Sequence, residues 1–247
     1  MSAANVLLNV EHLSGSIGGQ QVVEDITLSV PTSGVTAVLG RNGVGKTSTL
    51  KAIMGLINRS GTITFDGEPI DRELTHKIVQ RGIGYVPEDR EVFTELTVAE
   101  NLRLAVRGKI ERRQFIEELF PDLGPRANQR AGTLSGGQQQ MLSLARVLIN
   151  DNRLLLVDEP TKGLAPRLVD QVAAALAEAA QHTPILLVEQ NLPVIEQLAD
   201  HVVVIDAGIV VHTGRAADLL ADTEAVQRFL GVAAESDTPD STSEVNS

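Results

Sequence analysis

Residues 40–47 read Gly-Arg-Asn-Gly-Val-Gly-Lys-Thr, which fits the phosphate-binding loop pattern G-x-x-x-x-G-K-[ST] without a mismatch. The apolar run at residues 35–39 before it is typical of a buried strand, and a helical pattern follows from Lys46 to Met54. Glycines let the backbone turn its N–H groups inward, and the helix N-terminus adds a positive dipole end. This order of strand, loop and helix constrains the chain to an α/β core with a phosphate site at the end of a strand.

Two side chains at the end of this loop have predicted roles. Lys46 would reach the β- and γ-phosphates of a nucleotide, and the hydroxyl of Thr47 would ligate Mg²⁺. The competing interpretation is a glycine-rich turn that binds nothing. A chance match to all the fixed letters is rare in a chain of this composition, so we favour the nucleotide site.

The remaining patterns predict a mixed sheet. Residues 6–10 and 22–30 alternate apolar and polar side chains, as antiparallel strands at a sheet edge do. Strands alternating with helices further along the chain indicate a mainly parallel sheet that is covered on both faces. The further strands are predicted at residues 61–67, 82–87, 153–159, 184–188 and 201–206, and the further helices at 136–148, 166–181 and 191–199.

Residues 97–130 are polar and helical in pattern, without a strand signal. Thr97 is the expected N-cap of a helix there, and Glu100 three positions later completes a capping box. We interpret residues 92–150, approximately, as a helical subdomain inserted into the α/β core. Residues 232–247 contain acidic residues and no basic ones, which predicts a disordered acidic tail.

The composition argues against several classes of function. With 21 basic against 32 acidic residues, a net charge of −11 and no basic block, the chain is not expected to bind nucleic acid. The absence of cysteine excludes disulfides and thiolate catalysis, and the five histidines lack metal-ligand spacing. No unbroken apolar stretch approaches 18 residues, so any membrane attachment is expected to go through a partner.

Two carboxylates follow the apolar run at residues 154–157, where a buried strand would meet the nucleotide. Asp158 would hold Mg²⁺ through water, and Glu159 would polarise the attacking water as a general base. The alternative, a pair that caps a helix, is disfavoured downstream of a phosphate-binding loop.

A second anion-binding pattern lies at residues 134–138, Leu-Ser-Gly-Gly-Gln. Ser135, Gly136 and Gly137 open a predicted helix, so that backbone N–H groups and a hydroxyl would face a phosphate there, with Gln138 beside them. It is unusual for one chain to hold two such sites for one nucleotide.

The phosphate-binding loop, the LSGGQ segment and the Asp-Glu pair, in that order along the chain, resemble the ATP-binding cassette (ABC) family, and the resemblance covers residues 5–231. It implies the P-loop NTPase fold of that family: a mainly parallel sheet core, an antiparallel β edge and the inserted helical subdomain. In this family the LSGGQ sequence closes over the ATP held by the other subunit, so the resemblance implies a head-to-tail dimer, with itself or with a second ATPase. The implied ATP contacts are Gly40, Arg41, Asn42, Gly43, Val44, Gly45, Lys46, Thr47 and Ser48 in one chain, and Ser135, Gly136, Gly137 and Gln138 in the other.

Five short segments are similar in sequence to those of the ATPase subunits of branched-chain amino acid importers. They are residues 40–43, 86–90, 96–102, 163–166 and 188–191. Urea importer ATPases have very similar sequences at these segments and stay an open alternative. The resemblance implies a subunit bound to integral membrane permeases at the cytoplasmic face of the membrane, served indirectly by a solute-binding protein.

Four positions depart from the general family pattern. Ile17 stands where an aromatic ring usually stacks on adenine, and Ala165 replaces the usual aspartate after Gly-Leu. Glu88 replaces the glutamine that senses Mg²⁺, and a carboxylate can still supply an oxygen ligand. Gln190 replaces the switch histidine at the γ-phosphate and can donate a hydrogen bond without carrying charge. We expect slow but real hydrolysis.

Two other classes of function stay open. One is an ABC ATPase without a transport role, as in cofactor assembly or DNA maintenance; the 89 positions between Lys46 and Ser135 disfavour the DNA-organising relatives, which carry long coiled coils there. The other is a binding-only regulatory module that has lost turnover.

Overall fold

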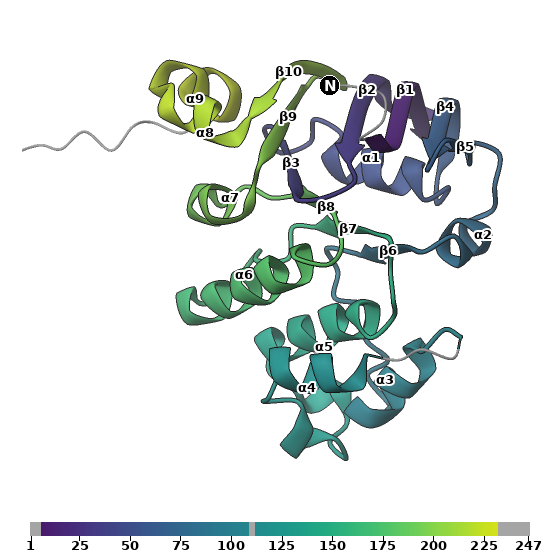
Figure 1. Cartoon of the computed structure of the whole chain (residues 1–247), viewed down its shortest axis with the longest axis vertical. Helices are drawn as coiled ribbons and strands as arrows, with labels where there is room; N and C mark the ends of the chain where they lie inside the picture. The colour runs from purple at the N-terminus through teal and green to yellow at the C-terminus, as the bar shows by residue number, and fades with distance from the viewer. Residues whose placement is uncertain (1–5, 109–111, 232–247) are drawn as a thin grey trace, which may run out of the picture.

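The computed structural model describes residues 6–108 and 112–231, so the predicted acidic tail at residues 232–247 lies outside the described residues. The strands form one sheet in the order β5-β4-β1-β2-β10-β9-β3-β8-β7-β6 (Figure 1). The strands are β1 (Val6–Ile17), β2 (Gln20–Pro31), β3 (Val35–Leu39), β4 (Asn58–Phe65), β5 (Glu68–Pro69), β6 (Ile83–Val86), β7 (Leu154–Asp158), β8 (Ile185–Val188), β9 (His201–Asp206) and β10 (Ile209–Arg215). The helices are α1 (Lys46–Ile53), α2 (Thr75–Gln80), α3 (Val98–Ala105), α4 (Arg113–Leu119), α5 (Gly136–Leu148), α6 (Pro166–Ala180), α7 (Leu192–Leu198), α8 (Ala216–Ala221) and α9 (Thr223–Leu230).

The antiparallel end of the sheet confirms the alternating pattern seen in the sequence. β1 pairs with β2 on one side and β4 on the other, so Val10 lies opposite both Leu28 and Ile63. These apolar side chains are buried in one core with Leu50 and Ile53 of α1. The outer edge itself is made by β4 and β5, because the strand at residues 58–65 pairs with the free side of β1.

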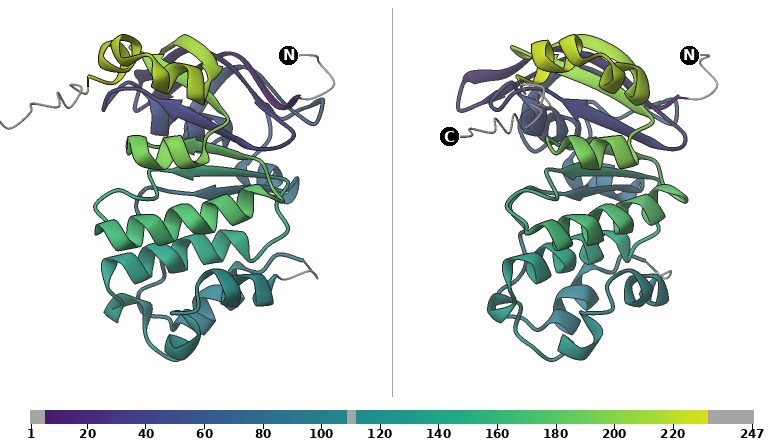
Figure 2. Two further views of the ribbon diagram at one scale, coloured as in Figure 1. Left: turned by 60° about the vertical axis from the view of Figure 1, so that its left-hand side comes forward. Right: turned by 90° about the vertical axis from the view of Figure 1, so that its left-hand side faces the viewer.

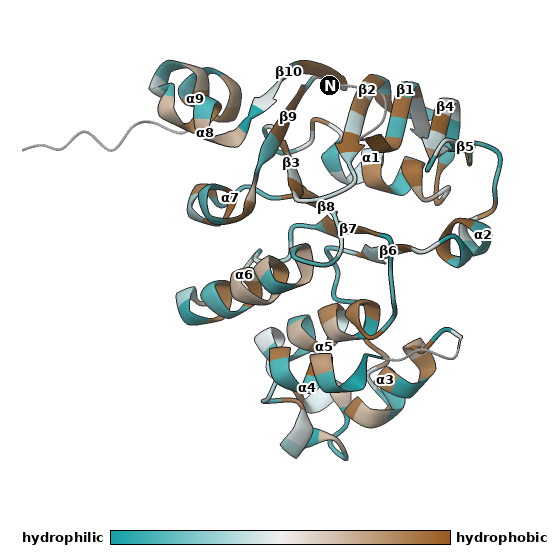
Figure 3. Cartoon of the chain, in the orientation of Figure 1, coloured by the Kyte–Doolittle hydropathy of each residue, from teal (hydrophilic) through white to brown (hydrophobic). Residues whose placement is uncertain are grey.

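The parallel part consists of β3, β6, β7, β8 and β9, and it also confirms the prediction. Every residue of β3, β7 and β8 is buried, as expected for strands covered on both faces. In Figure 3 these central strands are brown over most of their length, whereas α6 alternates between brown and teal. The carboxyl ends of neighbouring parallel strands meet at one edge of the sheet, which brings residues 40, 158 and 189 together.

The helices α3 to α5 gather at the end of the molecule opposite the antiparallel strands, and α5 runs beside α6 beneath the sheet (Figures 1 and 2). The capping box predicted at Thr97 is present: Glu100 N–H donates to Thr97 Oγ1 at 3.2 Å, and Thr97 N–H donates to Glu100 Oε2 at 2.8 Å. Ile116 of α4 and Leu144 of α5 share one core with Val157 of β7. The helical segment therefore packs continuously onto the sheet, and its division as a separate subdomain stays an interpretation.

Residues 207–230 contain structure that the sequence patterns do not predict. β10 follows β9 through a tight turn in which Ala207 and Gly208 have φ of 46° and 80°, and it pairs antiparallel with β9. Alternate residues of β10 are exposed, so it lacks the apolar run that marks the inner strands. Within the described residues, no helix is long and apolar enough to cross a membrane.

The buried strand β7 gives a test of this core. Replacing Leu156, which is fully buried, with alanine should lower the free energy of unfolding by about 2–5 kcal/mol, because the substitution removes apolar contacts and leaves a cavity. Urea unfolding followed by circular dichroism measures this. The matched control is Leu104→Ala on α3, where the side chain is 63% exposed and the loss should stay below about 0.5 kcal/mol. Equal losses at the two positions would contradict the described core.

Candidate nucleotide site

The phosphate-binding loop begins at the carboxyl end of β3 and runs directly into α1. Gly40 has φ of 142°, and a Cβ there would lie 2.1 Å from the backbone oxygen of Ile205 in β9. At Gly45, with φ of 102°, a Cβ would lie 2.7 Å from the backbone oxygen of Val22. Two strands therefore press against the loop so closely that glycine is required at both positions. Gly45 is also the N-cap of α1 and offers no side-chain cap, which leaves the first N–H groups free for a ligand.

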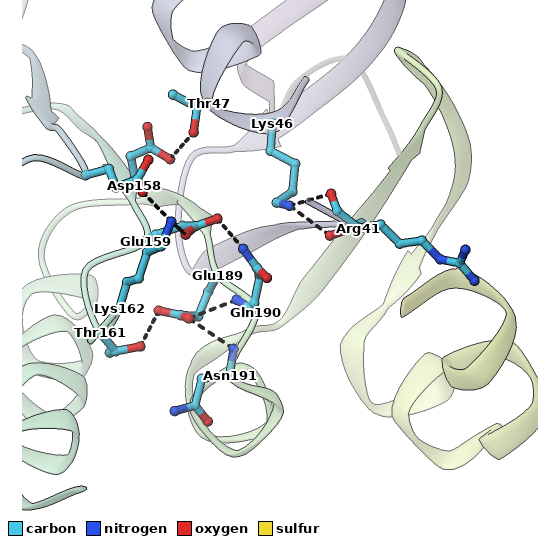
Figure 4. A network of polar contacts seen from close by, with 12 residues as sticks. Arg41, Lys46, Thr47, Asp158, Glu159, Thr161, Lys162, Glu189, Gln190 and Asn191 are labelled. Atoms are coloured by element: carbon cyan, nitrogen blue, oxygen red, sulfur yellow. Dashed lines mark hydrogen bonds and ion pairs between the residues drawn. The ribbon is translucent and has the colours of Figure 1, made fainter. Parts of the chain in front are cut away.

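Lys46 is buried, and its ammonium is held by the loop itself (Figure 4). Nζ donates to the backbone oxygens of Gly40 at 2.8 Å and Arg41 at 2.9 Å. Burial lowers the pKa of Lys46, and the carboxylates of Glu159 and Asp158 oppose that shift. An ammonium has three donors, so one remains for a phosphate oxygen.

The hydroxyl of Thr47 donates to Asp158 Oδ1 at 2.9 Å, which joins α1 to the end of β7. Tyr85 Oη donates to the other oxygen, Oδ2, at 3.3 Å. Burial raises the pKa of Asp158 to about 6, although the Thr47 hydrogen bond opposes the shift. Hydroxyl and carboxylate oxygens are hard donors, so this set fits Mg²⁺. Among the described residues no three acidic or histidine side chains form a metal cage by themselves, and Mg²⁺ is commonly held by one or two carboxylates together with substrate phosphates.

Glu159 follows Asp158 and adopts φ of 43°, a region that non-glycine residues rarely occupy. Its carboxylate is buried, and both oxygens have partners. Gln190 Nε2 donates to Oε1, and the Lys162 ammonium lies 3.1 Å from Oε2. The structure thus places the predicted general base beside the predicted γ-phosphate sensor. Glu88, on the loop after β6, reaches the same cluster by accepting a hydrogen bond from Lys162.

A cavity of 590 Å³ opens over the loop, a volume in the range of small-molecule sites. It is lined by Gln20, Gln21, Val22, Glu24, residues 42–48, Glu88, Glu159, Lys162, Ala207 and Gly208. Ile17 does not line it; that side chain is 49% exposed at the end of β1. Its predicted contact with adenine therefore stays a prediction.

The second anion-binding pattern has the predicted local form. Ser135 caps α5, where its Oγ accepts from Gln138 N–H at 3.3 Å, and Gln138 Oε1 accepts from Ser135 N–H at 3.0 Å. Gly137 sits so close to α6 that a Cβ would lie 2.2 Å from Leu168 Cδ1. None of residues 135–138 lines the cavity over the loop, so within one chain the two motifs do not form one site.

Four residues of the site were not predicted from the sequence: Tyr85, Thr161, Lys162 and Glu189. Glu189 is buried at the end of β8, where its Oε1 accepts from the backbone N–H groups of Gln190 and Asn191 at 2.8 and 3.0 Å. Its Oε2 accepts from Thr161 Oγ1 at 2.7 Å (Figure 4). Glu189 therefore fixes the backbone that presents Gln190. The signal that could have revealed it is a carboxylate directly after a buried strand, the same signal that marks Asp158.

Comparison with known proteins decides the family. Residues 23–162 match the family model described as ABC transporter. The chain belongs to the ABC transporter family. It is 34% identical to the high-affinity branched-chain amino acid transport ATP-binding protein BraG of Pseudomonas aeruginosa, over 91% of this chain and 100% of that protein. It is 30% identical to the lipopolysaccharide export system ATP-binding protein LptB of Haemophilus influenzae, over 91% of this chain and 97% of that one.

A solved nucleotide-free ATP-binding cassette of an ABC transporter has the same fold, with a TM-score of 0.78 at 23% identity over 90% of this chain and 98% of that one. This ABC protein is therefore an ATP-binding subunit with ATPase activity. The predicted fold class is confirmed. The individual roles of Lys46, Glu159 and Gln190 stay predictions, although the structure brings these residues to one site.

The buried carboxyl of Asp158 predicts a pH dependence of stability. Because its pKa rises from the ordinary 3.8 to about 6 in the folded chain, ionisation opposes folding as the pH rises between those values. Asp158→Asn should therefore raise the free energy of unfolding of the nucleotide-free chain by up to about 3 kcal/mol at pH 8, at about 1.4 kcal/mol per pKa unit. The gain should shrink below pH 6 and vanish below about pH 4. Urea unfolding across this range checks it, and an equal gain at every pH would contradict the assigned cause.

Proposed function

We propose that this chain is the ATP-hydrolysing subunit of an ABC importer for branched-chain or related amino acids, bound at the cytoplasmic face of the membrane through permease subunits. The observation that carries the proposal is the likeness to BraG, which extends over that protein's entire length. The sequence segments at residues 96–102 and 163–166, which resemble those of branched-chain amino acid importer ATPases, support the same assignment. A solute-binding protein would act indirectly, through the permease.

The site geometry supports a division of labour in hydrolysis. Lys46 would bind the phosphates from within the loop, and Thr47, Asp158 and Glu88 would hold Mg²⁺, which would neutralise charge on the phosphates. Glu159 accepts the proton of the attacking water. Gln190, hydrogen-bonded to Glu159, orients that carboxylate and contacts the γ-phosphate.

The LSGGQ segment supports a dimer. Ser135 is exposed at the N-terminus of α5, and residues 135–138 do not line their own chain's cavity. A helix N-terminus with a hydroxyl is suited to bind phosphate. We therefore infer that Ser135–Gln138 complete the nucleotide site of a second ATPase subunit, either another copy or a related chain.

A second cavity, of 430 Å³, lies between α1, α2, α5 and the loop after β6 and supports permease docking. Glu88 and Asp158 line it, and Glu88 also lines the cavity over the phosphate loop. Two exposed apolar side chains, Phe93 on the chain between β6 and α3 and Leu104 on α3, add apolar surface. A permease helix bound there would touch the loop that carries Glu88, which would link transport to hydrolysis.

Four alternatives compete with this proposal. The likeness to LptB favours an exporter as the second candidate, since it covers nearly all of both chains. A urea importer is a further candidate, because urea importer ATPases resemble this chain at the same sequence segments as the branched-chain amino acid importer ATPases. An ABC ATPase without a transport role, or a binding-only regulatory module, would keep the fold and lack the permease or the turnover.

The shared site predicts that activity depends on protein concentration. Phosphate release per chain should rise with concentration and reach a plateau above the dissociation constant of the dimer. Glu159→Gln and Lys46→Ala should abolish release at every concentration, which shows that the signal comes from this site. A rate per chain that stays flat through the dissociation range would contradict the shared site, and no turnover even with permease present would favour the binding-only module.

The importer proposal predicts a membrane partner and a direction of transport. The tagged chain should co-purify with integral permease subunits, and membranes containing the complex should take up labelled leucine in an ATP-dependent manner. Uptake of labelled urea instead would select the urea importer, and ATP-dependent release without uptake would select the exporter. If no permease co-purifies, the chain acts outside transport.

A further inference from the structure

Lys162 belongs to the site, yet neither the sequence motifs nor the proposed division of labour uses it. It lies on the loop between β7 and α6, three residues after Glu159. Its ammonium donates to Glu88 Oε1 and lies 3.1 Å from Glu159 Oε2. One cation therefore bridges the predicted metal ligand and the predicted general base (Figure 4 shows its contact with Glu159).

The position of Lys162 allows its ammonium to move away from its carboxylate partners. Its side chain is 57% exposed and lines the cavity over the phosphate loop, in contrast to the buried Lys46. The hydrogen bonds to Glu88 and Glu159 raise the pKa of Lys162, so it is charged at neutral pH. A long flexible ammonium on a solvated surface can exchange partners at small cost.

The two partners differ in how firmly they are held. The carboxylate of Glu159 is fixed, since it is buried and also bound by Gln190. The side chain of Glu88 is 33% exposed and lies on a loop, with Lys162 as its hydrogen-bond partner among the described residues. If the bridge opens, the contact with Glu88 is therefore the one expected to break.

We propose that Lys162 is a positioning residue whose ammonium pairs with Glu88 while the divalent cation is absent. The metal must then displace this ammonium from Glu88 when nucleotide binds. This inference rests on the proposed role of Glu88 as a Mg²⁺ ligand. A carboxylate paired with an ammonium is a weaker ligand, because two cations beside one carboxylate repel each other. The ammonium keeps its contact with Glu159, so Lys162 links metal arrival to the electrostatics of the general base.

The inference predicts that removing the ammonium strengthens metal binding. Lys162→Met keeps most of the aliphatic stem and should lower the dissociation constant of Mn²⁺ by roughly twofold to fivefold, the range expected for a partly exposed ion pair. The measurement is free Mn²⁺ by electron paramagnetic resonance, with the full chain saturated by a non-hydrolysable ATP analogue. Lys162→Arg, which keeps the charge, should remain close to the unchanged chain, and Lys77→Met on the exposed face of α2 is the matched control.

A double substitution assigns the effect to Glu88. Glu88→Gln alone should weaken Mn²⁺ binding, and Lys162→Met added to it should produce no further strengthening. Thermal unfolding of each variant confirms that it is folded. Mn²⁺ affinity that is unchanged or weaker in Lys162→Met, or a strengthening that persists with Glu88→Gln, would overturn the inference and leave the proposed metal site intact. If Glu88→Gln leaves Mn²⁺ affinity unchanged, Glu88 is no metal ligand, and the inference fails together with that part of the proposed function.

Discussion

The hydrogen bond between Thr47 and Asp158 is the contact on which the rest of the site depends. It joins the first turn of α1 to the end of β7, two segments 111 positions apart in the chain. Asp158 is fully buried, and the hydrogen bonds that Thr47 and Tyr85 donate to its carboxylate offset part of the cost of burying it. The same contact sets the spacing between the phosphate loop and Glu159, which follows Asp158 directly. The positions of Lys162 and Gln190 follow in turn, because both touch Glu159.

Much of this arrangement could be predicted from the sequence, because its strongest signals are local. The glycines at residues 40 and 45 mark backbone that only glycine can adopt beside two strands. Asp158 and Glu159 are the first carboxylates after a buried strand, and Thr97 and Ser135 carry complete capping boxes. Each of these patterns involves neighbouring residues and elementary stereochemistry. That is why the strands and helices of the parallel core lie where they were expected.

The rest depends on contacts between distant residues, which local patterns do not contain. Lys162 has no special sequence context; its importance comes from the approach of Glu88, 74 positions away. Ile17 was placed at the adenine by resemblance, and that contact stays a prediction; the hairpin residues that line the cavity are Gln20, Gln21, Val22 and Glu24. β10 was missed because its outward residues are exposed and its stability comes from pairing with β9. Long-range pairing of this kind is visible only in the folded chain.

The way the sheet is assembled has a mechanical consequence. The antiparallel strands meet the parallel part of the sheet along a short seam. Among the described residues one register pair, Ile209 with Asp25, links β10 to β2, and the N–H groups of Glu24 and Asp25 both donate to the Gly208 oxygen. One apolar core that includes α1 packs beneath both parts. The cavity over the phosphate loop lies across this seam, with Gln20, Gln21, Val22 and Glu24 on one side and Glu159 and Lys162 on the other. A nucleotide in that cavity would contact both parts of the sheet, which share an apolar core but few backbone hydrogen bonds at the seam. The ligand would then add contacts across the seam, so the two parts of the sheet would be held more firmly relative to each other when the site is filled.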